Sequence, residues 1–184
     1  MEAIEYFKTH WLRKKIWTHL TAEKHQLRLQ TCANLVKGRT YLDVGCACGH
    51  STMIMKGFNP GEWSGHDFHE DIAIEAKKFF PKMDFHYSNG YDILKEIDLK
   101  FDSVVCSEVM EHVKEHQKLI DGLMAITKKR LILTTPSVHV NDPGHLRIYD
   151  QEMIVKLFAN HNVKLTIRNK ARFWYIIADR KDEK

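Results

Sequence analysis

The feature that most constrains the fold is the alternation of strand-like and helix-like segments from residue 39 onward. Short runs rich in β-branched and aromatic residues alternate with amphipathic stretches of helical period. This alternation is typical of a parallel sheet with helices on both faces, because parallel neighbours need a long crossover connection. A sheet of this kind binds ligands where its strands end.

The expected strands are 40–44, 62–66, 84–87, 101–106, 130–134, 163–168 and 173–178. The expected helices between and after them are 50–57, 70–79, 91–97, 113–127 and 150–160. Only Asn169 to Arg172 separate the last two strands, which predicts a C-terminal antiparallel β-hairpin at the sheet edge. The expected fold class is α/β: a three-layer, doubly wound, Rossmann-like sheet of seven mostly parallel strands.

Before this sheet, residues 1–38 have the pattern of two helices, and Gly38 is expected to end the second. We expect these helices either to pack on the core or to form a lid. Residues 39–184 are expected to form the functional domain. A chain of 184 residues is long enough for one domain with a proper core.

Composition excludes several classes of protein. The formal charge of +4 is mild and the basic residues are dispersed, so a nucleic-acid partner is disfavoured. No secretory leader and no membrane-length apolar run is seen. Four cysteines without a disulfide spacing indicate a reduced, cytoplasmic protein. The sequence does not predict the oligomeric state.

The stretch YLDVGCACGH, residues 41–50, joins the first expected strand to the first crossover helix. Its cysteines are one residue apart and lack a second pair, which disfavours a zinc site. A phosphate-binding Walker loop would need a Gly-Lys-Ser/Thr ending, and a dinucleotide fingerprint would need glycine at positions 47 and 50. The sequence has Ala47 and His50 there.

The spacing Asp43-x-Gly45-x-Ala47-x-Gly49 resembles the first motif of class I S-adenosylmethionine-dependent methyltransferases, with Ala47 in place of the middle glycine. The resemblance implies that this turn, Cys46 included, lies against the methionine and ribose of S-adenosylmethionine. It also implies that Asp43 orders the turn and attracts the positive end of the cofactor. Gly45 and Gly49 permit close approach and unusual dihedral angles.

Asp67 follows the second expected strand, 22 positions after Gly45, where a ribose-binding acid is expected in this architecture. The alternative is that Asp67 only caps the next helix. Phe68 is expected to flank the adenine ring or, alternatively, to belong to the core. After the third strand, Asn89 with Gly90 is the expected adenine contact, and Asp92 competes for that role.

The stretch FDSVVCSEVMEHV, residues 101–113, resembles the fourth motif of the branch that contains the ubiquinone-biosynthesis O-methyltransferases. The resemblance covers about residues 39–135 and places Ser107 and Glu108 beside the cofactor. Related enzymes, including small-RNA 2′-O-methyltransferases, use such a motif for a metal. The resemblance therefore implies a divalent metal ion held by Glu108, Glu111, His112 and His145.

Glu108, Glu111 and His112 would share one face of a helical turn, and two carboxylates with imidazole suit a divalent cation. Alternatively, Glu111 favours a helix start and Glu108 holds a loop. His112 and His145 are the catalytic candidates, with His112 as a general base if no metal acidifies the acceptor. In the loop 136–149, His139, Arg147 and Tyr149 can also point at an acceptor.

The sequence therefore predicts a methyltransferase that uses S-adenosyl-L-methionine, with or without a divalent metal ion, to methylate a small-molecule acceptor at a hydroxyl. One alternative is a metal-dependent small-RNA 2′-O-methyltransferase. Another is a non-catalytic protein that binds S-adenosylmethionine.

Overall fold

A computed structural model describes residues 21–88 and 99–181 of the chain. Its seven strands form one sheet, with the order β3-β2-β1-β4-β5-β7-β6. The strands are β1 (Thr40–Val44), β2 (Glu62–Asp67), β3 (Asp84–Tyr87), β4 (Phe101–Ser107), β5 (Thr127–Pro136), β6 (Val163–Lys170) and β7 (Phe173–Arg180). The helices are α3 (Glu23–Leu35), α4 (His50–Phe58), α5 (Glu70–Phe79), the 3₁₀ turn η3 (Met110–His112), α6 (His116–Ile126) and α7 (Gln151–Leu157).

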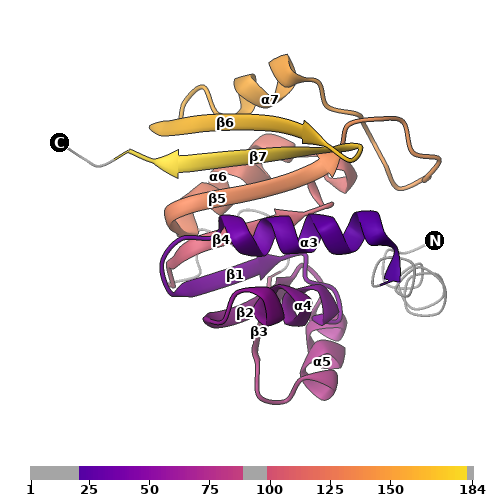
Figure 1. Cartoon of the computed structure of the whole chain (residues 1–184), viewed down its shortest axis with the longest axis vertical. Helices are drawn as coiled ribbons and strands as arrows, with labels where there is room; N and C mark the ends of the chain where they lie inside the picture. The colour runs from indigo at the N-terminus through magenta and orange to yellow at the C-terminus, as the bar shows by residue number, and fades with distance from the viewer. Residues whose placement is uncertain (1–20, 89–98, 182–184) are drawn as a thin grey trace.

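The sheet is parallel from β3 to β5 and antiparallel where β7 joins β5 and β6, so the expected fold class and hairpin are confirmed. From β1 the chain first builds outward to β2 and β3 and then returns to place β4 on the other side of β1. The strand order reverses between β1 and β4, and a crevice at their carboxyl ends is the usual ligand site of such sheets. Figure 1 shows the arrows of β1 and β5 ending on the same side of the molecule.

Two apolar cores, one on each face of the sheet, define the three layers. Neighbouring residues of one strand belong to different cores, as Val104 and Val105 of β4 do, because side chains alternate across a strand. One core contains buried residues of α6 and α7, and the other contains Leu29 of α3 and Met55 of α4. Figure 1 shows α3 lying across one face of the sheet, and α3 also packs on α4.

Several element boundaries differ from the sequence-based expectation. Helix α6 begins at His116 rather than at residue 113, because η3 occupies 110–112 first. Strand β5 begins at Thr127, three residues early, since Thr127 pairs with Phe101 before a bulge in the ladder. The expected helix at 91–97 and the helix expected before residue 21 lie outside the described residues. No helix among the described residues is both long and apolar enough to cross a membrane.

Candidate active site

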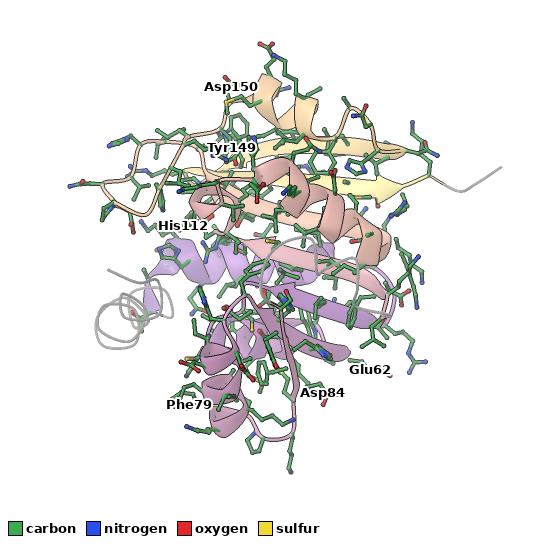
Figure 2. The ribbon with its side chains drawn as sticks, turned by 180° about the vertical axis from the view of Figure 1, so that it is seen from behind. Glu62, Phe79, Asp84, His112, Tyr149 and Asp150 are labelled. Carbon is green, nitrogen blue, oxygen red and sulfur yellow. The ribbon has the colours of Figure 1, made fainter. Side chains whose placement is uncertain are left out.

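A cavity of about 670 Å³ opens at the carboxyl ends of β1, β2 and β4. In Figure 2, His112 and Tyr149 lie toward this end of the sheet, opposite Glu62 and Asp84, which begin β2 and β3. The site residues expected from the sequence that line the cavity are Asp43, Gly45, Ala47, Asp67, Phe68, Ser107, Glu108, Glu111, His112 and His145. The topology therefore brings together residues that are spread over a hundred positions of the chain.

The turn after β1 depends on left-handed backbone. Gly45 has φ +77°, and a Cβ atom there would collide with the side chain of Val109, so glycine is needed. Ala47 also has a positive φ, +50°, which is unfavourable for a residue with a Cβ atom. Its backbone N–H donates to Oδ2 of Asp67 at 3.0 Å. This hydrogen bond holds the strained turn against the end of β2.

Asp43, the buried penultimate residue of β1, orders the start of α4. Its Oδ2 accepts hydrogen bonds from Thr52 Oγ1 at 2.7 Å and from Ser51 Oγ at 3.2 Å. Burial raises the pKa of Asp43 to about 6, and the two hydroxyls oppose that rise. A cationic group in the cavity would favour the ionised carboxylate.

Asp67 is the last residue of β2 and is 7% exposed. One carboxylate oxygen holds Ala47, and the other accepts from the backbone N–H of His69 at 3.2 Å. Burial raises the pKa of Asp67, and these backbone donors oppose the rise. Each oxygen has a second lone pair, so the carboxylate can still accept from ligand hydroxyls. Phe68 follows directly, half-buried at the cavity wall.

Two expected cofactor contacts of the described chain, Cys46 and Gly49, are not among the residues that line the cavity. Cys46 is buried, with its thiol close to Gly65 of β2, and Gly49 is the left-handed N-cap of α4. Both residues therefore shape the turn from behind. Asn89 and Gly90 lie outside the described residues.

Glu108 lines the cavity but lies apart from Glu111, His112 and His145. Its φ of +59° prevents the helical turn that was expected to start there. Instead, its Oε2 lies 3.1 Å from Nη1 of Arg28 in α3, and its Oε1 accepts from Thr134 Oγ1 at 3.2 Å. Thr134 in turn contacts the hydroxyl of Ser107 at 2.7 Å. The geometric cluster of metal-ligating groups does not include Glu108.

Arg28 was missed by the sequence analysis. It is 4% exposed, lines the cavity, and places its guanidinium 5.2 Å from the ring centre of Phe173. Nη1 of Arg28 is engaged in the ion pair with Glu108, whereas Nε has no hydrogen-bond acceptor among the described residues. A buried arginine at one helix position has no sequence signature, because its role depends on the strand that α3 covers.

Glu111, His112 and His145 form the expected acid–imidazole cluster. One ligand atom of each lies within 4.8 Å of the other two, and the imidazole centres of the two histidines are 4.7 Å apart. Two contacts hold the loop after β5 against η3: the N–H of Leu146 donates to the Glu111 carbonyl at 2.9 Å, and His112 Nδ1 lies 2.9 Å from the Gly144 carbonyl oxygen.

Glu111 is fully buried. Thr135 donates to its Oε2 at 3.1 Å, whereas Oε1 has no hydrogen-bond partner among the described residues. Burial, reinforced by the charge of Glu108, raises the pKa of Glu111 well above its ordinary value. Such a carboxyl group holds a proton unless a cation stabilises its charge.

Arg147 and Tyr149 do not face the cavity, contrary to expectation. Arg147 donates to the carbonyls of Val113 at 2.8 Å and Lys114 at 3.1 Å. The Tyr149 hydroxyl donates to the Met110 carbonyl at 3.0 Å. Both side chains thus fasten the loop to the segment around η3, while His139 lines the cavity as expected.

This fold and cavity are those of a methyltransferase. The chain matches the family model described as "Methyltransferase domain" over residues 16–175, so it belongs to that family. No curated protein matches the chain at a significant level.

Solved structures extend the likeness of fold. A magnesium protoporphyrin IX methyltransferase from Synechocystis PCC 6803 with bound S-adenosylhomocysteine is 16% identical, with 96% of this chain and 97% of that chain covered and a TM-score of 0.70. An O-methyltransferase family protein from Burkholderia thailandensis is 12% identical, covering 98% and 63% of the two chains with a TM-score of 0.73. The CurJ carbon methyltransferase is 10% identical, covering 93% and 58% with a TM-score of 0.74. Their names include both an oxygen and a carbon acceptor, so the fold does not decide the atom that is methylated.

Proposed function

We propose that the protein is an S-adenosylmethionine-dependent methyltransferase that methylates a hydroxyl group of a small-molecule acceptor. The observation that carries the proposal is a single cavity lined by the strained Gly45–Ala47 turn, the Asp67 carboxylate and the Glu111–His112–His145 cluster. The first two suit a nucleoside cofactor, and the third suits a hydroxyl nucleophile. The small-molecule acceptor is supported by the related fold of a porphyrin methyltransferase.

The cofactor would lie across the turn after β1. Asp67 would accept both ribose hydroxyls, Phe68 would contact the adenine, and the Gly45 backbone would touch the methionine chain. Arg28, whose Nε has no described acceptor, is placed to bind the methionine carboxylate. That carboxylate would accept a hydrogen bond from a guanidinium N–H group that the ion pair with Glu108 leaves unused.

The chemistry demands a positioned nucleophile and a route for one proton. The acceptor oxygen attacks the methyl carbon in line with the sulfonium, and the carbon–sulfur bond breaks as the new bond forms. The hydroxyl proton must leave, and His112 or His145 can accept it at an imidazole nitrogen. Exclusion of water and alignment by the cavity walls supply further acceleration.

The Glu111, His112 and His145 side chains also fit a divalent metal ion. Two imidazoles and one carboxylate suit ions such as Zn²⁺, Mn²⁺ or Fe²⁺, and the buried Oε1 of Glu111 lacks a described partner. When bound, such an ion acidifies a hydroxyl group that it coordinates. Glu111 and the two histidines would then hold the ion, and proton acceptance would fall to solvent or to His139 at the cavity wall.

Titration with S-adenosylhomocysteine in a calorimeter tests the cofactor site. Asp67→Asn is expected to weaken binding by about 10- to 100-fold, because hydrogen bonds to a charged group are lost or weakened. Asp84→Asn, at the exposed start of β3, is the matched control and should bind like the wild type. Unchanged affinity in Asp67→Asn would refute the ribose role, and no binding by the wild type would refute the function.

Cobalt loading tests the metal site without an activity assay. Co²⁺ bound by two imidazoles and a carboxylate is expected to give visible d–d absorption in the wild type. Glu111→Gln combined with His112→Ala should abolish that absorption, whereas His139→Ala should retain it. If the wild-type protein stays colourless and metal-free after loading, the metal site is refuted. The histidines would then accept the hydroxyl proton without a metal.

A further inference from the structure

The cavity has an outer half that the cofactor site does not use. It is formed by the first turns of α3, the beginning of the loop after β5, and the tight turn between β6 and β7. Figure 1 shows these three segments on the side where β5 ends. The backbone N–H of Ser137 donates to the Arg172 carbonyl at 2.9 Å and so joins the loop to the turn.

The turn between β6 and β7 is strained. Ala171 has φ +51° and Arg172 has φ +70°, in a two-residue connection where Asn and Gly are the preferred residues. Left-handed backbone is unfavourable at a residue with a Cβ atom, because the Cβ atom comes too close to the following carbonyl oxygen. Strain of this kind concentrates at ligand-binding positions. Arg172 is also one of the residues that line the cavity.

Two cations of this outer half, Lys24 and Arg172, have no acidic partner within 4.0 Å among the described residues. Burial raises the pKa of Glu108, and the charge of Lys24 is one of those that oppose the rise, so it acts on a group at the cavity wall. The charge of Arg28 is balanced by Glu108 at 3.1 Å. Asp142 also lines the cavity and keeps its charge, although it accepts from the Gly144 N–H at 2.9 Å. Lys24 and Arg172 outnumber this carboxylate, so the described part of the cavity mouth has an excess of positive charge.

Between these cations the wall is apolar. Val138 and Val140 of the loop and the ring of Phe173 line the same half. The Phe173 ring is buried and contacts α3 twice: its centre lies 5.7 Å from the ring centre of His25 and 5.2 Å from the guanidinium of Arg28. An aromatic face next to two cations fits a flat or apolar body that ends in a negative charge.

We propose that the methyl acceptor carries an anionic group, a carboxylate or a phosphate, which Lys24 and Arg172 bind at the cavity mouth while its apolar body lies along Phe173. This assignment rests on the proposed function, because it uses the inner half of the cavity for the cofactor. It predicts that charge on the acceptor, rather than size alone, determines which compounds bind.

Calorimetry on the full chain saturated with S-adenosylhomocysteine tests the proposal with four phenolic probes. 4-Hydroxybenzoate and 4-hydroxyphenyl phosphate carry the anion, 4-hydroxybenzyl alcohol is neutral, and 4-hydroxybenzylamine is cationic. We expect the anionic probes to bind about tenfold more tightly than the neutral one, and the amine to bind most weakly. The order of the two anions distinguishes a carboxylate from a phosphate.

Lys24→Gln with Arg172→Gln is expected to remove this preference and to leave the affinity for the neutral probe unchanged. Arg168→Gln, an exposed arginine of β6 that is not among the residues lining the cavity, is the matched control and should keep it. Equal binding of charged and neutral probes, no binding of either anion, or a preference that survives the double substitution would overturn the proposal. If one of these outcomes is found while S-adenosylhomocysteine still binds, only the anionic acceptor is refuted and the proposed function stands. If the wild type does not bind S-adenosylhomocysteine, both the proposed function and the anionic acceptor are refuted.

Discussion

Arg28 and Glu108 are charged residues that the fold places in its interior, beside the cavity rather than in bulk water. Removing one partner of such a pair costs more than replacing both, because the remaining charge is left without compensation. The pair also explains why Glu108 is separated from Glu111 and the histidines, although the sequence spacing suggested a shared face.

Arg28→Met is expected to lower the free energy of unfolding by about 3 kcal/mol at neutral pH, because the Glu108 carboxylate loses its partner. Chemical denaturation measures this loss. The double variant Arg28→Met/Glu108→Gln should recover most of it. If Arg28→Met were as stable as the wild type, water would already solvate the Glu108 carboxylate in the folded protein.

His66 provides a pH-dependent test of the core. It is fully buried, its Nε2 lies 2.8 Å from Ser88 Oγ, and burial lowers its pKa to about 4. The folded state therefore favours neutral imidazole. The contribution of neutral His66 to the free energy of unfolding is fully present above the unfolded pKa of about 6.5. It is lost as the pH falls toward 4, and the total loss is about 3 kcal/mol.

The stability difference between the wild type and His66→Gln, followed by urea denaturation from pH 7 to pH 4, is expected to shift in favour of the variant. Comparing the two proteins at each pH cancels the opposite effect of Asp43, whose raised pKa favours folding at low pH. A difference that does not vary with pH would mean that His66 is not held neutral.

At the scale of elements, the loop from residue 137 to 149 is the part of the site with least secondary structure of its own. Its position depends on side chains that bind the backbone near η3, with Tyr149 donating to the Met110 carbonyl and Arg147 to that of Val113. Trp174 of β7 adds a hydrogen bond to the Tyr149 carbonyl at 2.8 Å. His145 is thereby held beside Glu111 and His112.

Tyr149→Phe is expected to destabilise the protein by about 1–2 kcal/mol, because the Met110 carbonyl loses a buried donor. It should also weaken the cobalt absorption, with unchanged affinity for S-adenosylhomocysteine. Tyr41→Phe is the matched control: its hydroxyl also donates to a carbonyl, that of Gly38, but at the far end of β1. Equal effects of the two substitutions on cobalt binding would contradict a positioning role for Tyr149.

The sequence predicted the strands well, because buried strands such as 101–107 have apolar runs that local pattern reveals. It also predicted that the residues at the carboxyl ends of β1, β2 and β4 would lie close together, because parallel strands end at one edge of the sheet. It did not predict the partners of Arg28, Arg147 and Tyr149, which depend on contacts between distant segments. Nor did it predict the left-handed backbone of Glu108, which only the surrounding structure imposes.

At the scale of the whole molecule, ligand binding and folding are linked. A ligand that binds only the folded state adds about 2.7 kcal/mol at a hundred times its dissociation constant. For a chain of this length, S-adenosylhomocysteine at that concentration is expected to raise the Tm by about 5–10 °C. Differential scanning calorimetry measures the shift, and Asp67→Asn at the same ligand concentration should lose most of it. A Tm that the ligand leaves unchanged in the wild type would contradict the cofactor site.

All four cysteines of the chain are buried. Burial raises the pKa of Cys32 and of Cys48 to about 12, and those of Cys46 and Cys106 well above the ordinary value. A thiol-specific chromogenic reagent is therefore expected to react with none of them in the native protein and with all four in denaturant. Rapid reaction of any thiol in the native state would show that the sheet opens there.

Because the thiolate is the form of cysteine that is readily oxidised, the layered fold shields its thiols from peroxide and from air. Enzyme turnover would then continue under oxidative stress, and purified samples would keep without a reducing agent.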